Sequence, residues 1–298
     1  MGPINLENMG GISLKRYLAI WTMLLVITFS VTPTQACTLW AANGNAVEGG
    51  GSLIVKNRDW LPDHQQDVQL ISPADGYRYL GLFAIDGAHK GLKAGINEKG
   101  LVVVSATAGS IPVKERKGMP YTHGLSARLL KECNSVEEAI SKTDLFVGPQ
   151  ILMIADKEKI ATIEIGPEGN FSVMVKENEV IFHTNHYVAE SMLEFNHISG
   201  ISSQKRYSRI GELLKNISEK VDFDTFIALS KDQNDGPDNS IFRTGSTPNK
   251  ARTMAVWAVA IPQNNSPELY IRILNPNESE KILRINSEDV FKGNLLTE

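Results

Sequence analysis

The chain has 298 residues, of which 42% are hydrophobic and 21% charged, a composition typical of a globular protein with one large or two small domains. It contains 30 lysines and arginines against 34 aspartates and glutamates, which gives a net charge of −4. This mildly acidic balance, without a dense basic cluster, argues against a nucleic acid as partner.

An apolar run precedes the first cysteine. Residues 17–31, YLAIWTMLLVITFSV, follow two basic residues and contain no acidic one. They are too short for a bilayer span, which needs about 20 residues, but they suit the core of a signal peptide. Thr34 and Ala36 are the small residues expected at positions −3 and −1 of a cleavage site. The sequence therefore predicts a signal peptide over residues 1–36, removed by signal peptidase directly before Cys37.

The mature chain is then expected to be exported, either periplasmic or secreted, without a membrane span. Residues 37–298 contain no repeats, low-complexity tracts or Pro/Ser-rich linkers, so we expect a single domain. Whether it forms a homo-oligomer stays open.

The first hundred mature residues have the pattern of one strand after another. Glycines 49–51 are expected to form the turn between the first two strands. Further strands are expected over residues 51–60 and 77–85, and a hairpin over 91–109 with its turn at 97–100.

A helical period follows. Thr122 is the expected cap of a helix over residues 123–133, and Ser135 with Glu138 forms a capping box for the next helix. Strand patterns return at residues 150–156, 160–166 and 171–185, a second helical block covers 203–219 and 222–232, and strands close the chain at 253–262 and 268–276. Runs of antiparallel strands with two helical blocks indicate an α+β fold, and two facing sheets with a helical layer outside each would accommodate this order.

A cysteine at a mature N-terminus carries a nucleophile and a base on one residue. The ordinary pKa of an α-amine is about 8 and that of a cysteine thiol about 8.5, so the amine can accept the thiol proton near neutral pH. Such a site also needs a carboxylate that orients the amine and donors for an oxyanion. Cys37 is the candidate nucleophile.

Two polar residues at strand ends are candidates for these supporting roles. Asp59 lies in KNRDW, where it could orient the amine, although a turn or an ion pair with Arg58 would explain it equally well. Asn185 lies in FHTNHY and is a candidate oxyanion donor, although most asparagines at strand ends form turns. Arg243 and Arg252 are isolated arginines that could bind a carboxylate or be solvated loop charges.

Other chemistries are less well supported. His183 and His186 are close in sequence, but i and i+3 on a strand end point to different faces and no acidic residue has ligand spacing, so neither a metal nor another cofactor is expected. A disulfide between Cys37 and Cys133 is an alternative in an oxidising compartment, and so is a lipid on Cys37, although Thr34 replaces the leucine usual in lipoprotein signals.

Five features stand together in this chain: Cys37 after the signal cut, KNRDW, AGINEKGL, HTNHY and NSIFR. This set resembles the N-terminal-nucleophile (Ntn) hydrolases of the choloylglycine hydrolase and acyl-coenzyme A:isopenicillin N acyltransferase group, including its acid-ceramidase-like relatives. The motifs occur in the order Cys, R-N-x-D, G-x-N-E-x-G-L, T-N-H and S-I-x-R, and they extend over most of the mature chain.

The resemblance implies a four-layer αββα sandwich with two antiparallel sheets, and hydrolysis of a linear amide C–N bond through a thioester. It implies that Cys37 is nucleophile and base, that Asp59 holds the α-amine and that Asn185 donates to the oxyanion. Arg243 resembles the late active-site arginine of the family, and Arg252 is the alternative because loop lengths vary.

Two residues depart from the family pattern. Lys56 stands at the usual arginine position of R-N-x-D and keeps the charge but not the planar fork. Arg58 is not expected to substitute for it, because neighbours on a strand face opposite ways. Thr107 aligns approximately with a family asparagine and could offer one hydroxyl donor.

The sequence thus predicts an exported amidohydrolase that acts on a small-molecule N-acyl amide. Conjugated bile salts, N-acyl amino acids, acyl homoserine lactones, penicillin V and small peptides are all compatible substrates. An acyltransferase of the same family is an alternative, as is a non-catalytic exported binding protein with the same fold and an oxidised Cys37.

Overall fold

The computed structural model describes residues 36–85, 90–198, 200–217 and 219–293. All of them belong to one compact unit, Pro33–Glu298. Apart from Ala36, the predicted signal peptide lies outside the described residues. Within the described ranges, no helix combines the length and the apolar character that crossing a membrane requires.

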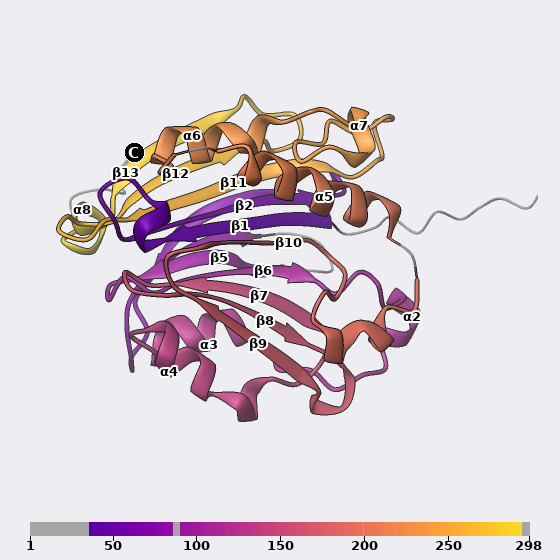
Figure 1. Cartoon of the computed structure of the whole chain (residues 1–298), viewed down its shortest axis with the longest axis horizontal. Coiled ribbons are helices and arrows are strands. Elements are labelled where there is room, and N and C mark those ends of the chain that lie inside the picture. Colours follow the sequence, from indigo (N-terminus) through magenta and orange to yellow (C-terminus); the bar gives the residue numbers. More distant parts are fainter. Residues whose placement is uncertain (1–35, 86–89, 199, 218, 294–298) are drawn as a thin grey trace, which may run out of the picture. The chain divides into compact units, whose positions relative to one another are not determined.

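One of the two sheets carries the start of the unit and its last strands (Figure 1). All its strand pairings are antiparallel. Its strand order is β10 (Val180–His183), β1 (Ala36–Asn43), β2 (Ser52–Trp60), β11 (Arg252–Ile261), β12 (Glu268–Ile273) and β13 (Lys281–Asn286). Because β1 lies between β10 and β2, residues that follow β10 come close to the start of β1.

The second sheet is a meander of consecutive strands, also antiparallel throughout. A short turn at residues 97–100 joins β5 to β6, whereas residues 108–149, which connect β6 to β7, carry helices. Its strands are β3 (Gln66–Ile71), β4 (Tyr79–Ala84), β5 (Gly91–Asn97), β6 (Val102–Thr107), β7 (Gln150–Ala155), β8 (Ile160–Ile165) and β9 (Phe171–Lys176).

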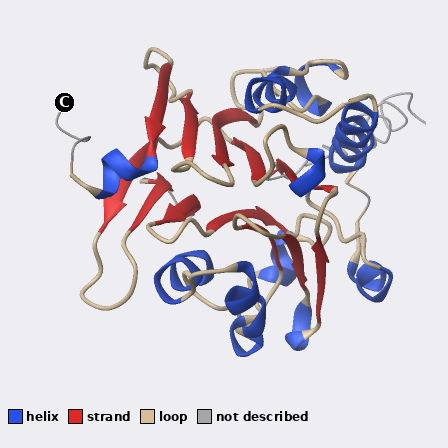
Figure 2. Ribbon diagram, turned by 60° about the vertical axis from the view of Figure 1, so that its left-hand side comes forward, coloured by secondary structure: helices blue, strands red, loops and turns tan. Residues whose placement is uncertain are grey.

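Helices cover the outer face of each sheet (Figure 2). Helices α5 (Ile201–Lys215) and α6 (Phe223–Ala228) pack on the first sheet, and α3 (Leu125–Glu132) and α4 (Val136–Ser141) pack on the second. The expected αββα layering is therefore confirmed. The remaining short helices are α2 (Val113–Arg116), α7 (Gly236–Asn239), α8 (Ser287–Phe291), η1 (Gly44–Ala46), η2 (Thr143–Leu145), η3 (Pro167–Gly169), η4 (Glu190–Phe195) and η5 (Leu229–Lys231).

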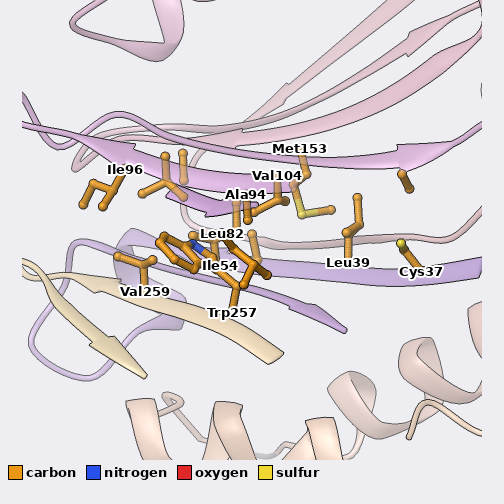
Figure 3. Packing of buried hydrophobic residues seen from close by; sticks show 14 of the residues in the cluster. Cys37, Leu39, Ile54, Leu82, Ala94, Ile96, Val104, Met153, Trp257 and Val259 are labelled. Atoms are coloured by element: carbon orange, nitrogen blue, oxygen red, sulfur yellow. The ribbon is translucent and has the colours of Figure 1, made fainter. Parts of the chain in front are cut away.

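The main core fills the space between the sheets, where alternate residues of each strand meet (Figure 3). Leu39 and Trp257 from the first sheet face Val104 and Met153 from the second, and all four are fully buried. Cys37 lies at the end of this row on β1, with its side chain on the same face as Leu39. The fold thus places the Cys37 thiol at one end of the inter-sheet core.

Several local predictions need correction. Helix α3 is capped by Gly124, whose φ of 66° is left-handed, and not by Thr122. The main-chain nitrogen of Thr122 instead donates to Val147 O at 3.0 Å, which ties the residue to the loop after η2. Ser135 does cap α4, as predicted. Strands β3 and β13 were not predicted because their residues alternate weakly in polarity, and β13 is a largely exposed edge.

Candidate active site

Cys37 is the second residue of β1 and lies directly opposite Arg58 of β2. Its side chain is nearly buried, with 7% of the residue exposed. The main-chain nitrogen of Cys37 donates to Asn185 Oδ1 at 2.7 Å. Ala36 precedes it in the described chain, so this nitrogen is a peptide nitrogen that would become an amine on cleavage between the two residues.

Asn185 follows β10 and is buried beside the start of β1. Its Oδ1 accepts from Cys37 N, and its Nδ2 donates to Thr107 O at 2.9 Å. The hydroxyl of Ser203 on α5 accepts from Asn185 N at 2.9 Å and so fixes the main chain of this residue. An amide nitrogen has two hydrogens, so Nδ2 keeps one donor beyond the bond to Thr107.

Asp59 is a fully buried carboxylate on β2, opposite Ala36 on one side and Thr253 of β11 on the other. Its Oδ1 accepts from Thr253 Oγ1 at 2.8 Å. Its Oδ2 lies 3.8 Å from Arg243 Nη1 and has no hydrogen-bond partner among the described residues. Burial raises the pKa of Asp59, although the positive charges of Arg243 and Arg206 oppose the shift.

The structure distinguishes the two candidate arginines. Arg243 is buried and is held by main-chain hydrogen bonds to Thr253, which place its guanidinium beside Asp59. Arg252 donates instead to Thr247 O and Pro248 O, both at 3.1 Å, and so closes its own loop. Arg243 is therefore the arginine that the fold brings to Asp59.

Lys56 and Arg58 are two residues apart on β2, so both side chains lie on the face that carries the Cys37 thiol. The rule that strand neighbours face opposite ways does not separate Arg58 from Lys56, because the alternation separates Arg58 from Asn57 and Asp59 only. Lys56 Nζ donates to Lys93 O and to Ser105 O, each at 2.6 Å. Burial lowers its pKa to about 8.

Thr107 contributes to this arrangement through its main chain. Its carbonyl oxygen accepts from Asn185 Nδ2 at 2.9 Å and thereby fixes the orientation of that amide. By sequence, its hydroxyl could offer one donor at the position of a family asparagine. The contact that the structure gives Thr107 is made by the carbonyl instead.

Arg206 is a central residue that the sequence did not single out. Its Nη1 donates to Cys37 O at 2.6 Å and to Thr38 Oγ1 at 2.9 Å, and its Nη2 donates to Asn185 Oδ1 at 3.1 Å. One buried guanidinium thus joins the chain at Cys37 to the Asn185 amide. A signal was present, because Arg206 shares the buried stripe of α5 with Ile210 and Leu214, where a charge is rarely found unpaired.

Replacing Arg206 with methionine is expected to destabilise the fold by about 3 kcal/mol, because two buried acceptors on β1 lose this donor and Asn185 Oδ1 keeps only Cys37 N. Urea unfolding measures this free energy. The matched control is Arg209→Met on the same helix, which removes a part-buried bond to Asp232 at the end of η5 and should cost clearly less. An equal loss in both variants would contradict the role assigned to Arg206.

Three histidines each contact a different partner, and the two cysteines do not form a disulfide. His183 Nε2 lies 2.7 Å from Glu164 Oε1, His186 Nδ1 lies 2.8 Å from Ser203 Oγ, and His197 Nδ1 lies 2.7 Å from Glu115 Oε2. Both cysteines are free thiols, and they belong to different core clusters. Burial raises the pKa of Cys133 to about 11, so its thiol is a poor nucleophile at neutral pH.

Two antiparallel sheets between helical layers form the αββα fold of the Ntn hydrolases. The solved structures agree with this fold. Two variants of conjugated bile acid hydrolase from Clostridium perfringens match with TM-scores of 0.55 and 0.56 and 14% and 15% identity, over 85% of this chain and 93% of theirs. Penicillin V acylase from Agrobacterium tumefaciens matches with a TM-score of 0.53 and 15% identity, over 85% of this chain and 86% of its own.

Residues 46–278 match the family model of acyl-coenzyme A:6-aminopenicillanic acid acyl-transferase, and the chain belongs to this family. The matched segment begins after Cys37 and includes Asp59, Asn185 and Arg243. No curated protein matches the sequence. The family and the fold support an enzyme of amide hydrolysis or acyl transfer.

Proposed function

We propose that the protein is an exported amidohydrolase that cleaves the C–N bond of an N-acyl substrate through a thioester on Cys37. Cleavage by signal peptidase after Ala36 would free the α-amine of Cys37 and so create the base. The observation that carries this proposal is the hydrogen bond of 2.7 Å between Cys37 N and Asn185 Oδ1, beside the buried Asp59 carboxylate. Any buried peptide nitrogen needs an acceptor, so the added weight comes from the buried Asp59 oxygen that has no hydrogen-bond partner among the described residues.

The freed amine has acceptors at hand. Asn185 Oδ1 already accepts one hydrogen from Cys37 N, and Asp59 Oδ2 is a buried acceptor without a hydrogen-bond partner in the described part of the chain. The Arg243 guanidinium lies 3.8 Å from this oxygen, beyond hydrogen-bond distance, so a buried acceptor still lacks a donor. In the proposed mature enzyme the α-amine supplies that donor, and Asp59 orients it.

The reaction then proceeds in two halves. The α-amine takes the thiol proton, and Cys37 Sγ attacks the amide carbon, so that an S–C bond forms and the carbonyl oxygen becomes an oxyanion. The remaining hydrogen of Asn185 Nδ2 donates to this oxyanion. The C–N bond breaks as the α-amine returns the proton to the leaving amine. Water, deprotonated by the same amine, then hydrolyses the thioester to a carboxylic acid and regenerates the thiol.

Acyl transfer is the second candidate, because the matched family is named for it. The first half-reaction is the same, and an acceptor amine takes the place of water in the second. The substrates in the names of the related structures, conjugated bile acids and penicillin V, are starting points for a screen. A non-catalytic binding protein is the alternative outside catalysis.

The test uses the purified protein as the cell processes it, with a panel of chromogenic N-acyl amides. We expect release of the amine, and acid quenching during turnover should trap an adduct with the mass of the acyl group on the Cys37 peptide. Adding an acceptor amine separates hydrolysis from transfer by the product formed. Amine release with an adduct on another residue, or no turnover across the panel by protein that begins at Cys37, would contradict the proposal.

A further inference from the structure

Arg58 is a buried cation with unused hydrogen-bond donors beside the thiol. The residue is 1% exposed and lies directly opposite Cys37 in the β1–β2 pairing, so the two side chains share one face of the sheet. Its Nε and Nη1 have no hydrogen-bond partner among the residues that the structure describes. Leaving charged N–H groups unpaired in a protein interior is costly, so these donors indicate a ligand.

The third guanidinium nitrogen shows how Arg58 is held in place. Arg58 Nη2 donates to His64 Nε2 at 2.8 Å, so this ring nitrogen is an acceptor. His64 therefore carries its proton on Nδ1, which donates to Asp63 Oδ1 at 2.6 Å. The Trp60 ring lies 5.3 Å from the guanidinium carbon. These contacts fix the side chain through Nη2 and leave Nε and Nη1 for another group.

The surroundings of Arg58 carry an excess of positive charge. Burial lowers the pKa of Arg58 to about 10, which still leaves it charged at neutral pH. Lys56, two residues away on the same face of β2, is a second buried cation. The neighbouring carboxylates serve other groups, since Asp63 holds His64 and Asp59 lies on the opposite face of β2. An anion at this position would offset the repulsion among the cations.

We infer that Arg58 binds an anionic group of the substrate next to the bond that Cys37 attacks. Lys56 is not part of this site, because its ammonium is held by two main-chain carbonyls. The inference rests on the proposed amidase function and narrows its substrate class to N-acyl amides with a carboxylate or sulfonate close to the scissile bond. That group belongs either to the acyl part or to the amine part of the substrate.

Alkylation of Cys37 tests the anion site without knowledge of the substrate. Iodoacetate and iodoacetamide both transfer a carbon to the thiolate with loss of iodide, and they differ in that one carries a carboxylate and the other an amide. The readout is the ratio of their rate constants at Cys37, followed by peptide mass. A change in the thiol pKa alters both rates equally, so the ratio isolates recognition of the anion. We expect this ratio to exceed that of free cysteine about tenfold or more.

Three variants make the result specific. Arg58→Met should reduce the ratio to that of free cysteine, whereas Arg58→Lys should retain part of the preference because it keeps the charge. Arg272→Met, which removes a surface arginine paired with Glu280, is the matched control and should leave the ratio unchanged. Circular dichroism establishes that each variant is folded. A ratio in the wild-type protein equal to that of free cysteine, or an unchanged preference in folded Arg58→Met, would overturn the inference.

Matched substrates then identify the source of the anion. One pair carries a terminal carboxylate or carboxamide on the acyl part, and a second pair carries the same two groups on the amine part. A preference for the acid of at least about tenfold in kcat/KM, lost in Arg58→Met, is expected in one of the two pairs. Equal turnover of acids and amides would refute the anion site while leaving the amidase proposal intact. Lack of any turnover with a normal alkylation preference would instead refute the amidase proposal alone.

Discussion

Replacing Cys37 with alanine is expected to lower amide turnover by about 10⁴-fold or more, because it removes the only group proposed to bond with the acyl carbon. The fold should persist, since the side chain lies at the end of the inter-sheet core and loses a single sulfur atom. Measuring kcat on the best amide of the screen, with thermal unfolding in parallel, gives both quantities.

Cys133→Ala is the matched control. This residue is the other cysteine of the chain, is fully buried against α3 and α4 and lies in a separate cluster. We expect a modest loss of stability and nearly unchanged kcat. Activity that survives in folded Cys37→Ala, or that disappears equally in Cys133→Ala, would move the nucleophile elsewhere.

Replacing Asn185 with alanine should reduce kcat by about 10² to 10³, the loss typical of one oxyanion donor. The amide is bonded at both ends, with Oδ1 accepting from Cys37 N and Arg206 and Nδ2 donating to Thr107 O, so its truncation also releases the nitrogen of the nucleophile residue. KM should change much less than kcat, because the lost interaction forms mainly in the transition state.

The control for this variant is Asn170→Ala, in the exposed turn after η3, where the amide donates to Pro167 O at 3.0 Å. It should leave kcat unchanged. A raised KM with unaltered kcat in Asn185→Ala would show that Asn185 holds the substrate and does not stabilise the oxyanion.

Much of the fold was predictable because strand and helix periods are local properties. The hairpin turn at Asn97–Gly100 and the capping by Ser135 depend on residues close in sequence, and both were predicted. The cap at Thr122 failed because the loop that binds its main chain comes more than twenty residues later. Strand β13 was not predicted, because an exposed edge strand needs no regular apolar pattern.

The candidate site was predictable in part for a similar reason. Asp59 and Asn185 end strands, so their positions near the start of β1 follow once the strand order is known. Arg206 was missed because its bond to Cys37 joins residues 169 apart in sequence, and a helix pattern does not reveal which strand it covers. The orientation of Arg58 could have been deduced, since residues i and i+2 of a strand share a face.

The determination of the N-terminus of the active protein tests the central claim most directly, because the proposed base exists only when Cys37 is the first residue. The processed and unprocessed forms of the exported protein should be purified apart and identified by intact mass and N-terminal sequencing. Each form is then assayed on the same amide. We predict that all activity resides in the form that begins at Cys37 with a free α-amine. Full activity in protein that still carries Ala36, or whose α-amine is acylated, would contradict the account.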